Sequence, residues 1–270
     1  MYRKFLHSFL AIAIITFTFT ACGDNSTGTT EEEPPALPNL EYSQPDVSYF
    51  ENTNVPMKSV SNNFLAAKNT VLSFSSLSSI GQLYGNILET APEGEASFSD
   101  GVWEWTYSYS FEGASSEMRI TAEESGNSIS WAVYLSYSDG QVTIENYKLM
   151  EGTTQNDGLT GNWTFNSFET DSSTPVPFLT SNWVTDGESE SEITIEILGE
   201  GSNGGVTISF DKAGAEFLML VNSESAGGEN IEIGWNTDTN LGYIQQGSEG
   251  PLCWDSSNNT VVDITCSMPG

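Results

Sequence analysis

Three cysteines carry the most specific chemistry in this sequence, and their spacing separates one of them from the other two. Cys22 lies near the start, whereas Cys253 and Cys266 form an even pair near the end. In an oxidising compartment such a pair is the usual framework of a disulfide. The turn-forming residues 256–259 lie between two short strand-like segments, so a hairpin would bring the pair within bonding distance. We therefore predict a Cys253–Cys266 disulfide. A catalytic or metal-binding pair is the alternative, although no CxxC spacing or third ligand accompanies it.

Aromatic rings are the second group of candidate residues. From Trp103 to Phe111 every second residue is aromatic, and tryptophans recur at Trp131 and Trp163. Such rings stack on sugars or line a cavity for an apolar ligand, but their burial is also a large stabilising contribution to a sheet. Core packing is the favoured interpretation. If the interior encloses a cavity, Trp103, Trp131 and Trp163 are the candidate ligand-binding residues.

The first 22 residues have the pattern of a secretory signal: two basic residues, an apolar run over 9–19 and small residues before a cysteine. The run is shorter than the about 20 residues that a transmembrane helix needs. At Phe19-Thr20-Ala21-Cys22 the sequence resembles the lipobox of bacterial lipoproteins, with Phe19 in place of the usual leucine.

This resemblance implies cleavage before Cys22, a diacylglycerol thioether on Cys22 and an amide-linked acyl chain such as palmitate on its amino group. The membrane is then a partner through this lipid. Gly23 stands where an inner-membrane retention signal has aspartate, so we expect the outer membrane, with the periplasmic and surface faces both open. A plain signal peptide, or an uncleaved anchor with an incidental cysteine, is the alternative.

The charge balance excludes one class of partner. The chain has seven basic and 37 acidic residues, a net charge of −30, and two of the seven, Arg3 and Lys4, lie in the leader, which leaves five. Nucleic-acid binding needs clustered lysine and arginine, so it is not expected.

Histidine is restricted to His7, inside the leader, which argues against histidine-based nucleophile systems and zinc sites in the mature chain. No catalytic residue, cofactor or metal site is expected. The remaining enzymatic route is a pair of carboxylates of the glycosidase kind. Glu104 lies between two tryptophans, but strand alternation places it on the face opposite the rings, where a solvated role is the simpler interpretation.

The chain divides into four segments. Residues 1–21 are the predicted signal peptide, 22–41 a lipidated, acidic tether rich in proline and threonine, 42–95 an extended lead-in with a helical segment, and 96–270 an antiparallel β domain. Apolar residues recur at helical spacing over 59–89, with Ser59 or Ser61 as N-cap. The serine-rich middle and Gly81 predict a break into two helical pieces.

After residue 94 the hydrophobic period changes to two, and turn residues such as Asp139-Gly140 join the alternating segments. About ten to twelve short strands joined by tight turns indicate a mainly β fold. The prediction is an antiparallel meander, closed as a barrel or folded as a two-sheet sandwich, with an N-terminal helical segment.

The expected function is that of a cell-envelope lipoprotein, a non-catalytic binding or structural module that takes a small apolar or glycan ligand. The alternative is a carboxylate-dependent glycan hydrolase of the envelope. A cavity lined by the three tryptophans would favour ligand carriage, whereas two carboxylates in an open cleft would favour hydrolysis. A filled interior without a cleft would leave adhesion or scaffolding. The sequence leaves the oligomeric state open.

Overall fold

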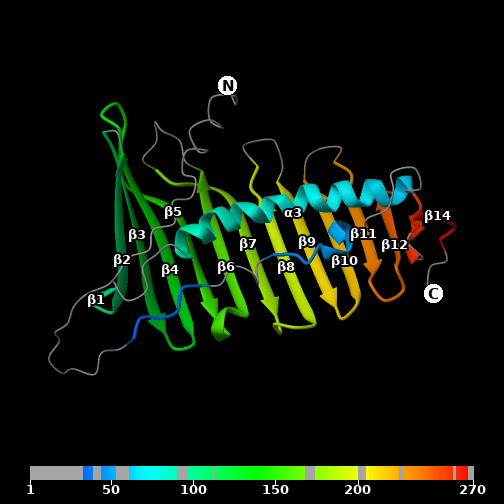
Figure 1. The fold of residues 1–270 in the computed structure, drawn as a ribbon, viewed down its shortest axis with the longest axis horizontal. Helices are drawn as coiled ribbons and strands as arrows, with labels where there is room; N and C mark the ends of the chain where they lie inside the picture. Colours follow the sequence, from blue (N-terminus) through cyan, green and yellow to red (C-terminus); the bar gives the residue numbers. More distant parts are fainter. Residues whose placement is uncertain are drawn as a thin grey trace. The chain divides into compact units, whose positions relative to one another are not determined.

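Figure 1 shows the computed structural model of the chain, which describes residues 33–38, 44–52, 61–89, 96–111, 113–167, 174–199, 205–224, 228–257 and 260–266. The chain divides into two compact units, Met1–Glu33 and Pro34–Gly270, and all the helices and strands described below belong to the second. The predicted leader, Cys22 and most of the tether over 22–41 lie outside the described residues.

The described part of the chain contains fourteen strands in one antiparallel sheet, and their order in the sheet is their order in the sequence. The mainly β meander predicted above is therefore confirmed. The strands are β1 Ser97–Ser99, β2 Val102–Phe111, β3 Ala114–Ser125, β4 Ser128–Ser138, β5 Thr143–Gln155, β6 Thr160–Ser167, β7 Val176–Thr185, β8 Glu190–Ile197, β9 Val206–Ala213, β10 Glu216–Ser223, β11 Ile231–Asn236, β12 Leu241–Gln246, β13 Leu252–Asp255 and β14 Val262–Ile264.

The expected closure of this meander, as a barrel or as two packed sheets, is not what the structure has. β1 and β14 lie at opposite ends of a single linear strand order, and no pairing joins them among the described strands. A second sheet is not needed to cover the aromatic face, because helical and extended segments that precede β1 pack on it. Among the described residues, the sheet therefore has one covered face and one face on which no helix or strand packs.

Two α-helices precede the sheet in the described residues, α2 (Ser48–Asn52) and α3 (Asn62–Glu89). Ser61 is the N-cap of α3, because its hydroxyl accepts the N–H of Phe64 at 3.0 Å and donates to the Asp263 carboxylate on β14. The predicted helical segment is confirmed over 62–89, and Ser59, the other N-cap candidate, lies outside the described residues. The predicted break is wrong, because α3 is continuous over 28 residues. Serine and glycine within a helix each cost about 1 kcal/mol or less relative to alanine, so neither residue type by itself ends the helix.

α3 crosses the strands on one face of the sheet in the view of Figure 1. A helix of 28 residues is about 42 Å long, or about nine strand spacings. Its first half packs on β12, β13 and β14 through Phe64, Ala67 and Val71, which are all buried. Phe64 lies 5.8 Å from Trp254, and Phe50 of α2 lies 5.0 Å from Trp235, measured between ring centroids.

We call the covered face, which carries these tryptophans, the inner face. Large and small side chains alternate along one of its rows, so that each tryptophan has a small residue beside it on the next strand: Trp103, Ala122, Trp131, Gly152, Trp163 and Ser181. A Cβ at Gly152 would collide with the Trp163 ring and with the Asn162 carbonyl. The glycine is therefore needed for the close approach of this ring to the neighbouring backbone.

The predicted disulfide between Cys253 and Cys266 is present, with a Cα–Cα distance of 5.3 Å. It joins β13 to the residues that follow β14, so it fixes the last hairpin of the sheet. Asp263 of the same hairpin bonds to Ser61 at the start of α3. Together these contacts hold the C-terminal edge of the sheet against the helix.

Candidate interaction surface

The three tryptophans singled out in the sequence lie in the packed interior. Trp103, Trp131 and Trp163 are 7%, 2% and 1% exposed, and all three belong to one row of the inner face. Trp131 stacks on Trp105 at a centroid distance of 6.2 Å and donates its indole N–H to Thr154 at 2.9 Å. Their burial makes all three rings part of the core cluster, and their role as ligand contacts remains a prediction.

The opposite face, which we call the outer face, is polar and open. The pairing of β5 to β8 places one row of hydroxyl and amide side chains directly across four strands: Thr153, Asn162, Asn182 and Thr194. A second row, two residues further along, contains Gln155, Thr160, Val184 and Glu192. The three strand spacings from β5 to β8 correspond to about 14 Å.

A shallow hollow of about 280 Å³, the outer hollow, lies over these two rows and is lined by all eight of their residues. Within it Asn162 donates its amide to the Thr153 hydroxyl at 2.6 Å. The side chains of Gln155, Asn182 and Thr194 make no hydrogen bond to any described residue. Their donors and acceptors are therefore available to a ligand.

Two carboxylates lie at the β9 side of the outer hollow. Glu192 on β8 pairs directly with Asp211 on β9, and directly paired positions bring Cβ atoms to about 5 Å of one another. Burial, followed by the negative charge of Glu192, raises the pKa of Asp211 above its ordinary value. Of the described residues, Glu192 and Asp211 come closest to the pair of carboxylates that a glycan hydrolase would need. The sequence analysis singled out neither of them. That Glu192 and Asp211 are neighbours can be recognised only once the register between β8 and β9 is known.

Glu104, the acid that the sequence did single out, has a different role. It forms an ion pair with Arg119 at 3.1 Å on the outer face. The Arg119 guanidinium also donates to Asn146 at 2.7 Å and lies 4.1 Å from the centre of the Tyr134 ring. Glu104 is thus part of a surface polar network on β2 to β5, and none of the four residues of this network lines the outer hollow.

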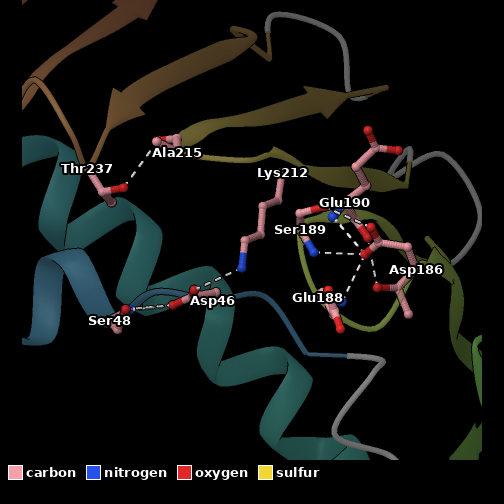
Figure 2. Close-up of polar contacts among 10 residues, drawn as sticks. Asp46, Ser48, Asp186, Glu188, Ser189, Glu190, Lys212, Ala215 and Thr237 are labelled. Carbon is pink, nitrogen blue, oxygen red and sulfur yellow. Dashed lines mark hydrogen bonds and ion pairs between the residues drawn. The ribbon is translucent and has the colours of Figure 1, made fainter.

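The hairpin between β7 and β8 is fixed by Asp186, as Figure 2 shows. One oxygen of its carboxylate accepts the backbone N–H groups of Glu188, Ser189 and Glu190 at 2.8 to 2.9 Å. These backbone hydrogen bonds hold the pKa of Asp186 well below its ordinary value. Because the hairpin follows Val184 and precedes Glu192, this turn positions two residues that line the outer hollow.

Figure 2 also shows the ion pair that ties the segment before α2 to the sheet. Lys212 on β9 lies 3.5 Å from Asp46, which accepts hydrogen bonds from the backbone and the hydroxyl of Ser48. Burial acts to raise the pKa of Asp46, but the Ser48 hydrogen bonds and the Lys212 charge together lower it. Lys212 and Arg119 are therefore both paired with carboxylates.

In the described part of the chain, no three histidine, cysteine, aspartate or glutamate side chains converge as metal ligands do. None of the described helices combines the length and apolar character needed to span a bilayer. Comparison with models of known protein families, with curated proteins and with solved structures finds no match to this chain.

Proposed function

We propose that this chain is a cell-envelope lipoprotein, anchored through a lipid on Cys22, whose outer hollow binds a neutral glycan without catalysis. The observation that carries the glycan part is the outer hollow, where hydroxyl and amide side chains are aligned across four strands and those of Gln155, Asn182 and Thr194 make no hydrogen bond to a described residue. The filled inner face supports the same choice, because the large apolar residues there pack against each other and the covering segments.

Charge selects the class of glycan. Glu192 is the one charged residue among those that line the outer hollow, and the sequence as a whole has a net charge of −30. An anionic polymer would be repelled by this charge, while a cation would find a single carboxylate in the lining. An uncharged sugar chain can form hydrogen bonds with the donors and acceptors of the Asn and Thr side chains. The C–H groups of the sugar can also pack against the apolar side chain of Val184. Val184 is 55% exposed, so it is accessible to such a ligand.

Binding is tested by isothermal titration of the full chain with neutral hexasaccharides of glucose, N-acetylglucosamine, xylose and mannose. We expect one of them to bind, and Asn182→Ala and Thr194→Val each to weaken that binding about three- to tenfold, because each loses one hydrogen bond. Asn222→Ala is the matched control, an exposed outer-face asparagine on β10 away from the outer hollow. Equal effects of Asn182→Ala and Asn222→Ala, or no binding by any probe, would argue against the proposal.

The Glu192–Asp211 pair favours hydrolysis as a second candidate function. Two adjacent carboxyl groups, one of which has a raised pKa, form the arrangement of a general acid and its partner. The test is release of new reducing ends from the hexasaccharide that binds. Hydrolysis that Asp211→Asn and Glu192→Gln abolish would replace the non-catalytic proposal, whereas binding without any new reducing ends would support it.

The anchor rests on Phe19-Thr20-Ala21-Cys22 and the apolar run before it. We expect mass spectrometry of chain purified from its own membranes to find diacylglycerol and an amide-linked acyl group on an N-terminal Cys22. We also expect Cys22→Ser to release the chain from the membrane fraction. An unmodified Cys22 in a soluble fraction would refute the anchor while leaving the glycan titration untouched.

A further inference from the structure

At the N-terminal edge of the sheet, a long stretch of β2 has no described strand paired with one of its sides. β1 pairs with Val102, Trp103 and Glu104 only, so β3 is the one described strand that pairs with the Trp105–Phe111 stretch of β2. Figure 1 shows β1 as a short strand beside one end of β2. We call Trp105–Phe111 the open edge.

The backbone groups that point outward at the open edge can be identified from the β1–β2 turn. Asp100 and Gly101 have φ values of 55° and 85°, the pattern of a two-residue hairpin closed by the pair Ser99 and Val102. Because residues along a strand alternate in the direction of their hydrogen bonds, Thr106, Ser108 and Ser110 direct their N–H and C=O groups away from β3. No backbone hydrogen bond from these three residues to another strand or loop is present in the described part of the chain.

Natural sheets protect such edges with charges, prolines, bulges or very short strands. The open edge, Trp-Thr-Tyr-Ser-Tyr-Ser-Phe, contains no charged residue and no proline, and its pairing with β3 has no bulge. The opposite edge is protected, since β14 has three residues and directs Asp263 to the inner face, where it bonds to Ser61. The contrast indicates that the open edge is kept for pairing with a further strand.

We infer that the further strand is the open edge of a second copy of this chain, joined antiparallel about a two-fold axis at Ser108. In this register Ser108 faces its own copy, Thr106 faces Ser110, and Tyr107 faces Tyr109. Every aromatic residue lies opposite an aromatic residue and every hydroxyl opposite a hydroxyl, so the sequence is complementary to itself. The three outward residues would exchange about six backbone hydrogen bonds.

Exposure at the open edge supports this partner. Tyr109 is 57% exposed although its side chain belongs to the inner face, and Tyr107 of a second copy would lie against it. The stretch itself carries no charge, but each chain has a net charge of −30. Repulsion between two copies is therefore screened by salt, and the dimer is expected to be more stable at high ionic strength.

The register is tested by disulfide cross-linking of the full chain carrying Cys22→Ser, which removes the one cysteine outside the native disulfide. Directly opposed residues in a hydrogen-bonded pair have Cα atoms about 5.5 Å apart, within the range of a disulfide. Ser108→Cys is therefore expected to form a covalent dimer on oxidation. Thr106→Cys alone places the two thiols about 13 Å apart and is the matched control. A mixture of Thr106→Cys and Ser110→Cys chains is expected to cross-link as a heterodimer.

Sedimentation of the chain without added cysteines provides the second measurement. We expect a monomer–dimer equilibrium that shifts toward dimer at high salt, and Ser108→Lys and Ser108→Pro to weaken it about tenfold or more. The Ser108 N–H points outward, so proline at this position leaves the pairing with β3 intact, and near-ultraviolet circular dichroism checks the fold. A monomer at every concentration and salt, or equal cross-linking of Ser108→Cys and Thr106→Cys, would overturn the inference. Neither result depends on glycan binding.

Discussion

Alternate residues of the same four strands, β5 to β8, have two different surroundings. Trp163 on β6 points to the inner face and is 1% exposed, whereas its neighbour Asn162 points to the outer face and is exposed. On β7 the same contrast holds between Ser181, 6% exposed, and Asn182. The inner residues determine packing, while the outer ones need only tolerate solvent. In a one-layer sheet, substitutions on the inner face therefore change stability, whereas substitutions of the adjacent outer-face residues can change ligand recognition.

The difference between the two faces arises from the way in which the inner face is covered. α3 and the segment before it pack on the inner face, so the sheet does not need a second sheet, and no described helix or strand packs on its outer face. In a sandwich of two sheets each outer face would also be open, but each sheet would depend on the other for its register. Here the register is fixed by hairpins such as the Asp186 turn.

The largest expected effect is that of Trp163→Ala. Loss of this buried ring leaves a cavity, so we expect the free energy of unfolding to fall by about 3–5 kcal/mol. Asn162→Ala, one residue away on the outer face, should change it by about 1 kcal/mol or less. Urea unfolding followed by far-ultraviolet circular dichroism measures both. Similar losses for the two variants would break the comparison between the faces.

An intermediate effect is expected for Gly152→Ala. The added Cβ meets the Trp163 ring and the Asn162 carbonyl, and the backbone part of that collision cannot be relieved by a rotamer change. We expect a loss of about 1–3 kcal/mol in the same urea experiment. Gly250→Ala is the control, because a Cβ there has no atom within 4 Å, and its effect should stay within about 0.5 kcal/mol. A neutral Gly152→Ala would show that the row of large and small residues is loosely packed.

The smallest effect is that of Tyr243→Phe, which sharpens the comparison because Tyr243 lies on the outer face. Its hydroxyl donates to Glu232 at 2.7 Å, and burial together with this carboxylate raises the pKa of Tyr243 to about 12 from 10.0. Because its pKa is higher in the folded than in the unfolded chain, the neutral Tyr243 hydroxyl contributes to the free energy of unfolding below pH 10. This contribution is lost as the pH rises toward 12. We expect Tyr243→Phe to lower the unfolding free energy by about 1 kcal/mol at pH 8.

The same variant should approach the parent chain above pH 10, because the parent then loses the contribution of the hydroxyl. Urea unfolding at pH 8 and at pH 11 distinguishes the pH-dependent contribution of the Tyr243 hydroxyl from a packing effect of the ring, which does not depend on pH. A difference that stays constant between the two pH values would show that Glu232 does not favour the neutral phenol.

Period-two alternation predicted much of this fold from the sequence, since the aromatic residues between Trp103 and Phe111 do share one face. The Asp139-Gly140 turn, the helix and the disulfide were also predictable, because each depends on local residue types. The Asp100-Gly101 turn carries the same dipeptide signal. The choice of one sheet was not predictable, because it depends on what covers the inner face.

The outer hollow could not be found from local patterns. Asn162, Asn182 and Thr194 lie on three strands, and their neighbourhood exists only once each hairpin has fixed its register. A shift of one residue in any pairing would send one of them to the inner face. The open edge is nearer to prediction, since the run from Trp105 to Phe111 without a charge is visible in the sequence.

The separation of the two faces is tested most directly by the rate at which a thiol reagent modifies Ser181→Cys and Asn182→Cys, each in the chain with Cys22→Ser. Under native conditions we predict that the cysteine at 182 reacts nearly as fast as in the urea-unfolded chain, whereas the cysteine at 181 reacts orders of magnitude more slowly, limited by opening of the structure. Equal rates for the two cysteines would contradict a sheet with one packed face and one face free for binding.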